Sequence, residues 1–291
     1  MSAISAIDVA WRALAVGAAA LVALYAGLTV GVLVGYARRA LYVNAAGARA
    51  RFGAGPAGIP RTPGPLAFVA LVLREAFAQM RILGWTLMRR GALLVEDGAG
   101  DPVLLLHGLM ADGTSMWALR RALHERGRPT SAPHLGGMFR PIEKYAERLA
   151  LALDALLQRH PGAAGVDVVC HSMGGIVLRA CLAVRPDLAP HIRHVVTIAS
   201  PHEGTAGARG VPFAEARQLF VGAPWLAALP TLRALLPQAR ITTIASRHDC
   251  VVYPGETTHV QGAAHHDFDL VGHAELLLHP RVAGLVVDAV S

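Results

Sequence analysis

The sequence has few charged side chains, few aromatic side chains and few cysteines. Charged residues make up 16% of its 291 positions and aromatic residues 5%, whereas hydrophobic residues make up 54%. A soluble domain usually carries about 25% charged residues, so this composition is not that of an ordinary soluble protein. The three cysteines are odd in number, which argues against a disulfide framework and is compatible with a reducing compartment. The length suits one sizeable core rather than two.

Lysine is nearly absent, and the basic side chains are almost all arginine. Lysine and arginine together number 27 against 20 acidic residues, which gives a formal net charge of +7. Such a balance suits nucleic acid or an anionic membrane surface. The chain has no basic tract with interleaved aromatic residues. We therefore expect no nucleic-acid partner and favour a membrane.

Metal-ligating side chains do not occur at a usable spacing. The nearest approach is the pair His265-His266, followed by Asp267 and Asp269. Adjacent histidines point apart in a strand, and we interpret this stretch as a solvated loop. We expect no metal ion and no cofactor.

One long apolar run lies near the amino terminus. No charged residue occurs from Ala13 to Ala37, and a membrane-spanning helix needs about 20 apolar residues. We predict a single-pass transmembrane anchor over residues 1–37, with a cleaved signal peptide or a buried helix as alternatives. Small residues recur at every fourth position of the run, which would allow a homodimer through this helix: Gly27, Gly31 and Gly35.

The arginines around this run predict its orientation. Arg12 precedes it, and four arginines follow it: Arg38, Arg39, Arg49 and Arg51. The positive-inside rule then places the carboxyl-terminal part of the chain in the cytoplasm. The opposite orientation is the alternative.

Residues 38–90 are predicted to connect the anchor to a catalytic domain. Residues 44–65 are rich in glycine and proline and are interpreted as a linker. The apolar stretch Leu66–Met88 is interrupted by charged side chains, which favours an amphipathic helix on the membrane or on the catalytic domain. Residues 91–96 predict a first strand. Further along, His279 precedes Pro280 and is expected at a helix end.

The residues at 170–175, Cys-His-Ser-Met-Gly-Gly, carry the clearest chemical signal. Apolar runs on both sides predict a buried strand, a tight turn and a helix. A serine in such a turn has a strained backbone and an outward hydroxyl, between small residues. Ser172 is therefore the candidate nucleophile; the alternative is a glycine-rich turn that only joins strand to helix. Cys170 stands where glycine is usual, and we interpret it as a packing residue.

A serine hydroxyl needs a base to take its proton and a carboxylate to orient that base. Residues 240–246 predict a strand, and Asp249 follows its carboxyl end, where catalytic residues of open α/β sheets gather. The alternative for Asp249 is an Asx turn that caps the loop. As the base we prefer His273, which lies in a loop before an apolar run that predicts a docked helix. His265 or His266 is the alternative base.

Acyl transfer also needs two backbone N–H groups directed at the developing oxyanion. One is expected from Met173, directly after the candidate nucleophile. The other is expected from the loop after the apolar run 102–106, where His107 and Gly108 make a turn. Our candidate there is the Leu109 amide, with His107 as a structural residue that fixes the loop.

These segments resemble the α/β-hydrolases, and among them the small bacterial lipases and esterases with a His-Ser-Met-Gly-Gly turn. The similarity covers residues 91–291 and rests on four segments: Leu106-His107-Gly108-Leu109, His171 to Gly175, the Ser-Pro-His-x-Gly-Thr stretch at 200–205, and Asp249 with His273. The resemblance implies an α/β fold with a mostly parallel sheet and helices on both faces, here behind an N-terminal transmembrane helix. It implies a triad of Ser172, His273 and Asp249, with Leu109 and Met173 as oxyanion donors.

The resemblance implies a serine hydrolase that cleaves carboxylic esters through an acyl-enzyme. With the anchor, we expect lipid-like apolar acyl esters as substrates, membrane lipid as a neighbour and the inner membrane of a bacterium as the location. The alternatives are an acyltransferase or thioesterase on the same fold, and a non-catalytic membrane scaffold or folding helper. Residues 206–238 are strongly apolar and are hypothesised to form a lid or acyl-binding wall, with ordinary packing helices as the alternative.

Overall fold

The structure is a computed structural model that describes residues 3–44, 63–88, 100–137 and 139–291. Its described residues form a six-stranded sheet in the order β2-β1-β3-β4-β5-β6, in which every neighbouring pair is parallel. The strands are β1 (Val103–Leu106), β2 (Thr130–Ser131), β3 (Val166–His171), β4 (Ile192–Ile198), β5 (Arg240–Ser246) and β6 (Ala264–Phe268). The predicted α/β class with a mostly parallel sheet is confirmed.

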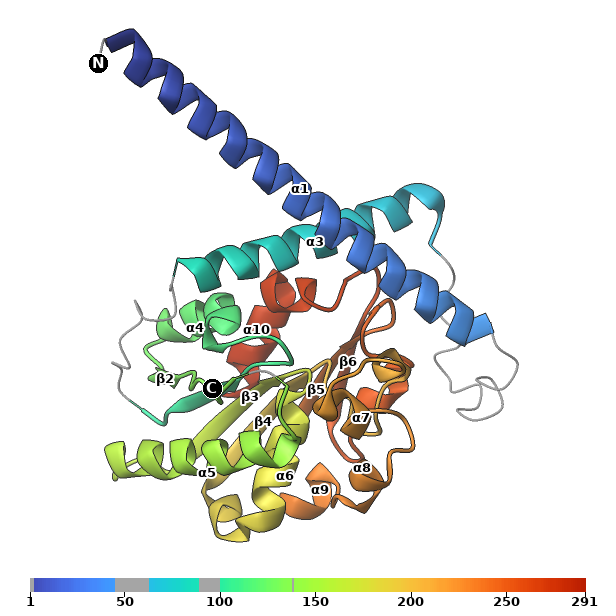
Figure 1. Ribbon diagram of the computed structural model, residues 1–291. Helices are drawn as coiled ribbons and strands as arrows, with labels where there is room; N and C mark the ends of the chain where they lie inside the picture. The colour runs from blue at the N-terminus through green and yellow to red at the C-terminus, as the bar shows by residue number, and fades with distance from the viewer. Residues whose placement is uncertain (1–2, 45–62, 89–99, 138) are drawn as a thin grey trace.

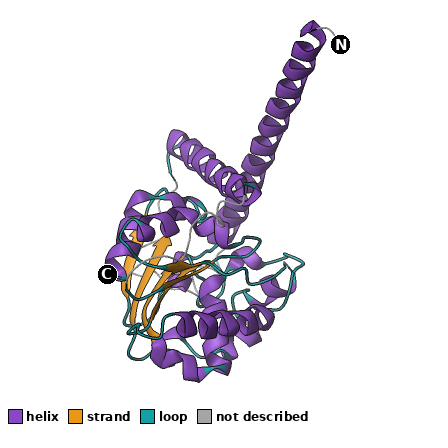
Figure 2. Ribbon diagram, turned by 90° about the vertical axis from the view of Figure 1, so that its left-hand side faces the viewer, coloured by secondary structure: helices purple, strands orange, loops and turns teal. Residues whose placement is uncertain are grey.

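Helices cover both faces of this sheet, as Figures 1 and 2 show. One face packs on α5 (Ile142–Arg159) and α6 (Gly174–Val184), and the other on α4 (Trp117–His124), η6 (Glu275–Leu278) and α10 (Pro280–Ala289). Successive side chains of a strand point to opposite faces. In β1, Leu104 and Leu106 therefore enter the first core, while Val103 and Leu105 enter the second. This two-sided burial explains why β1 is a continuous apolar run.

The strand order reverses beside β1. The chain runs from β1 outward to β2, then crosses to β3 on the other side of β1. The carboxyl ends of β1 and β3 therefore open next to each other, at the kind of switch point where open α/β sheets bind ligands. Ser172 follows β3 directly, and Leu109 lies in the loop after β1.

The helix α1 (Ala3–Asn44) precedes the sheet, and its first half projects away from the rest of the molecule (Figures 1 and 2). Its 27 residues from Val16 to Tyr42 are long and apolar enough to cross a membrane, and 6% of the most apolar window is buried. That exposure excludes the alternative of a buried core helix. By length and composition the segment could cross a membrane or act as a signal sequence. The predicted apolar N-terminal helix is confirmed.

The second half of α1 packs against α3 (Pro65–Leu87) and the domain below it. Val32 and Tyr36 share a buried cluster with residues of α3 and with Cys250. Arg38 donates to the carbonyl oxygens of Gly207 and Arg209, and Arg39 donates to that of Arg247 at 2.5 Å. Because these bonds hold the last turns, the helix continues past the predicted anchor at 1–37 through residues 38–44. The rest of the expected linker, residues 45–62, lies outside the described residues, as does the strand expected at 91–96.

The structure confirms the helix predicted at 66–88, since α3 spans Pro65–Leu87. It also places His279 at a helix end, as expected, since His279 is the C-cap of η6. The same residue is the N-cap of α10, and its Nδ1 accepts the Arg281 amide at 3.2 Å. One smaller expectation is contradicted. The residues 264–268, expected as a solvated loop, form β6. Because β6 lies at the edge of the sheet, it pairs on one side only and can carry polar side chains.

The apolar segment 206–238 consists of short helices: η4 (Ala206–Ala208), α7 (Ala214–Gln218), α8 (Pro224–Ala228) and α9 (Leu232–Leu235). Leu219, Leu226 and Leu232 are buried in the same core as α5 and α6. The Arg179 guanidinium of α6 donates to the carbonyl oxygens of Leu229 and Pro230 at 2.8 and 3.0 Å. These contacts agree with the packing alternative for this segment, and its role as a lid or acyl-binding wall stays a prediction.

Candidate active site

Ser172 occupies the turn between β3 and α6. Its φ is +53°, in the left-handed region that non-glycine residues rarely adopt, at a cost of about 1 kcal/mol or more. The Ser172 amide donates to the Ile198 carbonyl at 2.8 Å, which fixes the turn against the end of β4. A Cβ at Gly108 would lie 2.9 Å from Ser172 Cβ, and one at Gly174 would lie 2.7 Å from the Leu106 carbonyl oxygen. The turn therefore requires glycine at position 174 and in the neighbouring loop at position 108.

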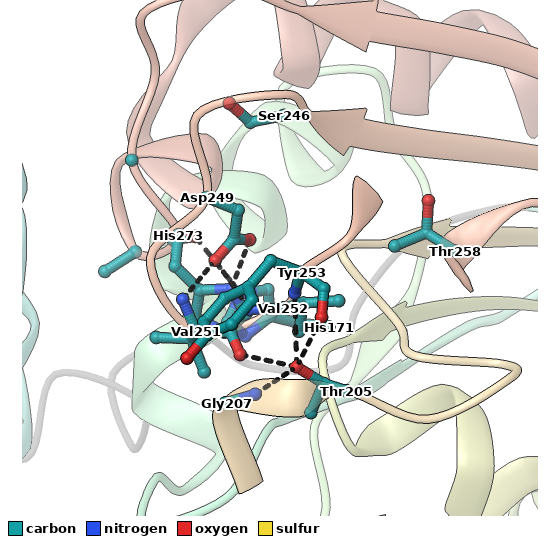
Figure 3. A network of polar contacts seen from close by, with 12 residues as sticks. His171, Thr205, Gly207, Ser246, Asp249, Val251, Val252, Tyr253, Thr258 and His273 are labelled. Atoms are coloured by element: carbon teal, nitrogen blue, oxygen red, sulfur yellow. Dashed lines mark hydrogen bonds and ion pairs between the residues drawn. The ribbon is translucent and has the colours of Figure 1, made fainter. Parts of the chain in front are cut away.

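The fold brings Asp249 and His273 into contact. His273 Nδ1 lies 2.7 Å from Asp249 Oδ2, and both side chains are buried (Figure 3). The other oxygen, Asp249 Oδ1, accepts the amides of Val251 and Val252 at 2.7 and 2.8 Å. Asp249 therefore makes the Asx-type turn that was its alternative reading, and it also holds the imidazole. With Nδ1 directed at the carboxylate, Nε2 of His273 is left to exchange a proton.

The imidazole of His273 lies beside that of His171, the residue before Ser172. The two ring centroids are 4.7 Å apart, and His171 Nε2 is 3.4 Å from the His273 carbonyl oxygen. Burial, together with repulsion from His273, lowers the pKa of His171 well below its usual value. His171 is therefore neutral and places His273 next to the serine turn without competing for its charge.

Opposing influences set the pKa of His273. Burial lowers it, whereas the charge of Asp249, the hydrogen bond to Asp249 and the charge of Glu75 raise it, and the pKa ends above its usual value near 6.5. The two carboxylates thus favour the imidazolium form. That is the form a general base reaches after it accepts a proton from a nucleophile.

Thr205 ties the loop of Asp249 to the segment after β4, as Figure 3 shows. Its Oγ1 donates to the Val251 carbonyl at 2.8 Å. It also accepts the amides of Tyr253 at 3.1 Å and Gly207 at 3.0 Å. Thr205 belongs to one of the four segments that resemble the lipases and esterases, but no contact was predicted for it. Its partners Val251 and Tyr253 lie 46 and 48 residues further along the chain.

The two predicted oxyanion donors lie at the neighbouring ends of β1 and β3. Met173 is buried and is the N-cap of α6, while Leu109 is half-buried in the loop after β1. The close approach of Gly108 to Ser172 brings these two loops together. His107 Nδ1 lies 3.0 Å from the Gly108 carbonyl oxygen, a contact that fits a structural role for His107. The assignment of both amides as oxyanion donors stays a prediction.

The remaining candidates have other surroundings. Cys170 is fully buried, in register between Leu106 of β1 and Thr197 of β4. Burial raises the pKa of its thiol, so the sulfur stays protonated and packs as a small apolar group. His265 and His266 lie on β6, and His265 Nδ1 contacts Thr243 rather than Asp249. The structure therefore favours His273 over these two histidines as the partner of Asp249.

Comparison with solved structures identifies the fold. Aspergillus fumigatus lipase B superposes with a TM-score of 0.57 at 18% identity, over 65% of this chain and 52% of the lipase. The mature form of Bacillus licheniformis lipase BlEst2 superposes with a TM-score of 0.53 at 16% identity, over 63% of this chain and 89% of that chain. This protein has the α/β-hydrolase fold. The similarity spans about half the length of the Aspergillus lipase, and at these identities it concerns the fold alone.

The sequence also matches a family model. The model, described as palmitoyl protein thioesterase, covers residues 102–229. That range includes the Leu109 loop and Ser172 but ends before Asp249 and His273. No curated protein sequence matches the chain.

One buried carboxylate near the site was missed by sequence reasoning. Glu75 on α3 is fully buried, and its oxygens accept the amides of Ala274 and Glu275, next to His273. In the sequence, Glu75 only interrupts an apolar stretch. Its partners lie 199 and 200 residues further along the chain, so no local pattern could have indicated the contact.

Proposed function

We propose that this protein is a membrane-anchored serine hydrolase that cleaves lipid-like acyl esters. The observation that carries the proposal is the buried Asp249–His273 pair, which lies against His171 and so beside the strained turn of Ser172. The lipase neighbours and the thioesterase family match support a hydrolase on this fold.

In the proposed mechanism, Ser172 Oγ attacks the acyl carbonyl while His273 Nε2 takes the hydroxyl proton. Asp249 holds the imidazole and stabilises its positive charge. The Leu109 and Met173 amides stabilise the tetrahedral oxyanion. The intermediate collapses to an acyl-enzyme as His273 returns the proton to the leaving group. Water then attacks the acyl-enzyme by the same route and releases the acid.

The N-terminal helices support a bilayer as the source of substrate. α3 lies on the side from which α1 projects (Figures 1 and 2). Large apolar side chains on one stripe of α3 are exposed, with the fractions in parentheses: Leu66 (88%), Val69 (53%), Leu73 (42%), Phe77 (49%) and Leu87 (74%). The first four are spaced three or four residues apart, and Leu87 follows further along, so all five lie on one face of the helix. An exposed apolar stripe beside a potential span fits a helix that lies in the membrane surface.

The side of the membrane stays part of the proposal. Arg38 and Arg39, two of the arginines that predict a cytoplasmic domain, bind loop carbonyls of the same chain. Their presence therefore has a second explanation, and the cytoplasmic assignment rests more on Arg49 and Arg51. A homodimer through α1 is also untested; a Cβ placed on Gly35 of the small-residue stripe would lie 3.3 Å from the Cys250 carbonyl oxygen, so this glycine already faces its own chain.

A thioesterase is the second candidate function. The palmitoyl protein thioesterase model covers the segment with Ser172 and the Leu109 loop. Thioesters and oxyesters pass through the same acyl-enzyme, and they differ in the leaving group. An acyltransferase would use the same residues with an acceptor other than water.

Substrate selection separates these functions. We expect the full chain in phospholipid vesicles to hydrolyse long-chain acyl esters with a kcat/KM at least about 10-fold above that for acetyl esters, because each buried CH₂ stabilises the complex by about 0.8 kcal/mol. The measurement is hydrolysis of matched oxyester and thioester series from two to sixteen carbons. Preference for thioesters at every length would favour the thioesterase, and acyl transfer to added alcohol in place of acid release would favour the acyltransferase. No hydrolysis of either series would contradict the proposed function.

The pKa of His273 predicts the pH dependence. The base must be neutral to accept a proton, and the carboxylates raise its pKa above 6.5. We therefore expect kcat/KM to fall on the acidic side with an apparent pKa above 6.5, and to reach a plateau at higher pH. The measurement is a pH profile of kcat/KM, which reports the free enzyme. A plateau that extends well below pH 6 would contradict the assignment.

A further inference from the structure

We propose that Glu75, on the N-terminal helix α3, is a positioning residue for His273. The carboxylate holds the two backbone amides that directly follow the histidine and adds a second negative charge beside the Asp249–His273 pair. The inference rests on the proposed function in so far as His273 is the base. It makes the membrane-proximal helix part of the support of the active site.

The contacts of Glu75 suit a carboxylate. Oε1 accepts the Ala274 amide at 3.0 Å, and Oε2 accepts the Glu275 amide at 2.9 Å. The Gln79 side chain, one turn along α3, donates to Oε1 at 3.0 Å. All three partners are N–H donors. An ionised carboxylate can accept from all of them, whereas a protonated acid would direct its own O–H group against one of these donors. Burial raises the pKa of Glu75, while these bonds and the charge of His273 oppose that rise.

Gly272, the residue before His273, lies close to the same Glu75 carboxylate. A Cβ at Gly272 would lie 2.2 Å from Glu75 Oε2, so only glycine allows this approach. The Gly272 amide donates to the Glu275 carboxylate at 3.0 Å, and Arg74 of α3 pairs with that carboxylate at 2.7 Å. Glu75 of α3 thus holds the residues after His273 directly, while Gly272 before it is held by Glu275, which pairs with Arg74 of α3. Burial of Glu75 itself is complete.

The charge of Glu75 acts on a site with few other charges. The titratable and charged groups that face His273, its loop and Asp249 come from five parts of the chain: Asp249 and Cys250 after β5, His171 in β3, Glu75 and Arg74 on α3, Glu275 in η6, and Tyr36 and Arg39 on α1. His171 is neutral, and Arg74 is paired with Glu275. Removal of the Glu75 charge should therefore destabilise the imidazolium.

The test compares Glu75→Gln with wild type in the full chain. The substitution keeps the shape but places an NH₂ group against a backbone N–H donor and removes the charge. We expect the pKa of the His273 imidazole to fall by about one pH unit. It is followed by NMR of histidine-labelled protein in detergent, with His273→Gln to assign the signal. Where wild type is active, kcat per fluorophosphonate-titrated site should fall about 10- to 100-fold with KM within about twofold.

Glu147→Gln is the matched control, since Glu147 is an exposed glutamate of α5 that pairs with Lys144; it should change neither quantity. If Glu75→Gln does not fold, Gly272→Ala provides the same test, because its methyl group must displace the carboxylate. An unchanged pKa of His273 in the folded variant would overturn the inference, whatever the activity. An inactive wild type would instead contradict the proposed function, and the NMR titration would still decide whether Glu75 acts on His273.

Discussion

Ser172→Ala should abolish labelling by a fluorophosphonate probe and lower kcat by roughly 10⁴- to 10⁶-fold. The reason is that Ser172 is the only nucleophile in the proposed mechanism, and no neighbouring group has the same position in the strained turn. Loss of one hydroxyl leaves the glycine contacts of the turn unchanged, so the variant should fold. The measurements are in-gel labelling and single-turnover hydrolysis on the full chain.

Cys170→Ala is the matched control, because its thiol is the nearest alternative nucleophile in the sequence. The buried, protonated thiol should not react, so the variant should label like wild type. Probe bound to Ser172→Ala, or absent from wild type, would refute the assignment of the nucleophile. The second outcome would also favour the non-catalytic scaffold that the sequence left open.

His273→Ala should lower kcat by about 10⁴-fold or more, because the serine loses its base and the leaving group loses its acid. His265→Ala and His266→Ala should retain activity, since both histidines lie on the edge strand β6 and His265 contacts Thr243 rather than Asp249. Asp249→Asn should reproduce most of the loss while the buried loop keeps its shape, because an amide no longer stabilises the imidazolium. The measurement is kcat at a pH on the plateau of the wild-type profile.

This comparison can fail in two informative ways. Full activity of His273→Ala would show that another histidine acts as base and would sink the proposed triad. Full activity of Asp249→Asn with an inactive His273→Ala would show that the aspartate serves only the Asx-type turn through Val251 and Val252.

Sequence reasoning succeeded where the signal is local. The strand 240–246 agrees with β5, and the strand, turn and helix around Ser172 are present. Each follows from apolar runs, turn residues and the spacing of small side chains over a few positions. His265 and His266 show the limit, because a polar run looks like a loop until its place at a sheet edge is known.

Sequence reasoning failed where the decisive contact is distant. The helical turns at 38–44 depend on loop carbonyls near residues 207 and 247. Thr205 and Glu75 act on loops far along the chain, and neither contact leaves a periodic trace in the sequence. His279 ends η6 as predicted, but its second role as the N-cap of α10 was not predicted, since the proline that ends one helix can also begin the next.

By itself the sequence determined the chemistry that is available: a serine in a glycine-lined turn, an aspartate after a strand, a histidine in a later loop and an apolar N-terminal helix. These depend on residue type and short-range geometry. Only the tertiary structure decided which histidine meets Asp249, and that Glu75 of α3 supports the His273 loop. Such pairings depend on how strands and helices pack. A buried carboxylate must find hydrogen-bond donors among the groups packed around it, and these groups can lie far away in the sequence.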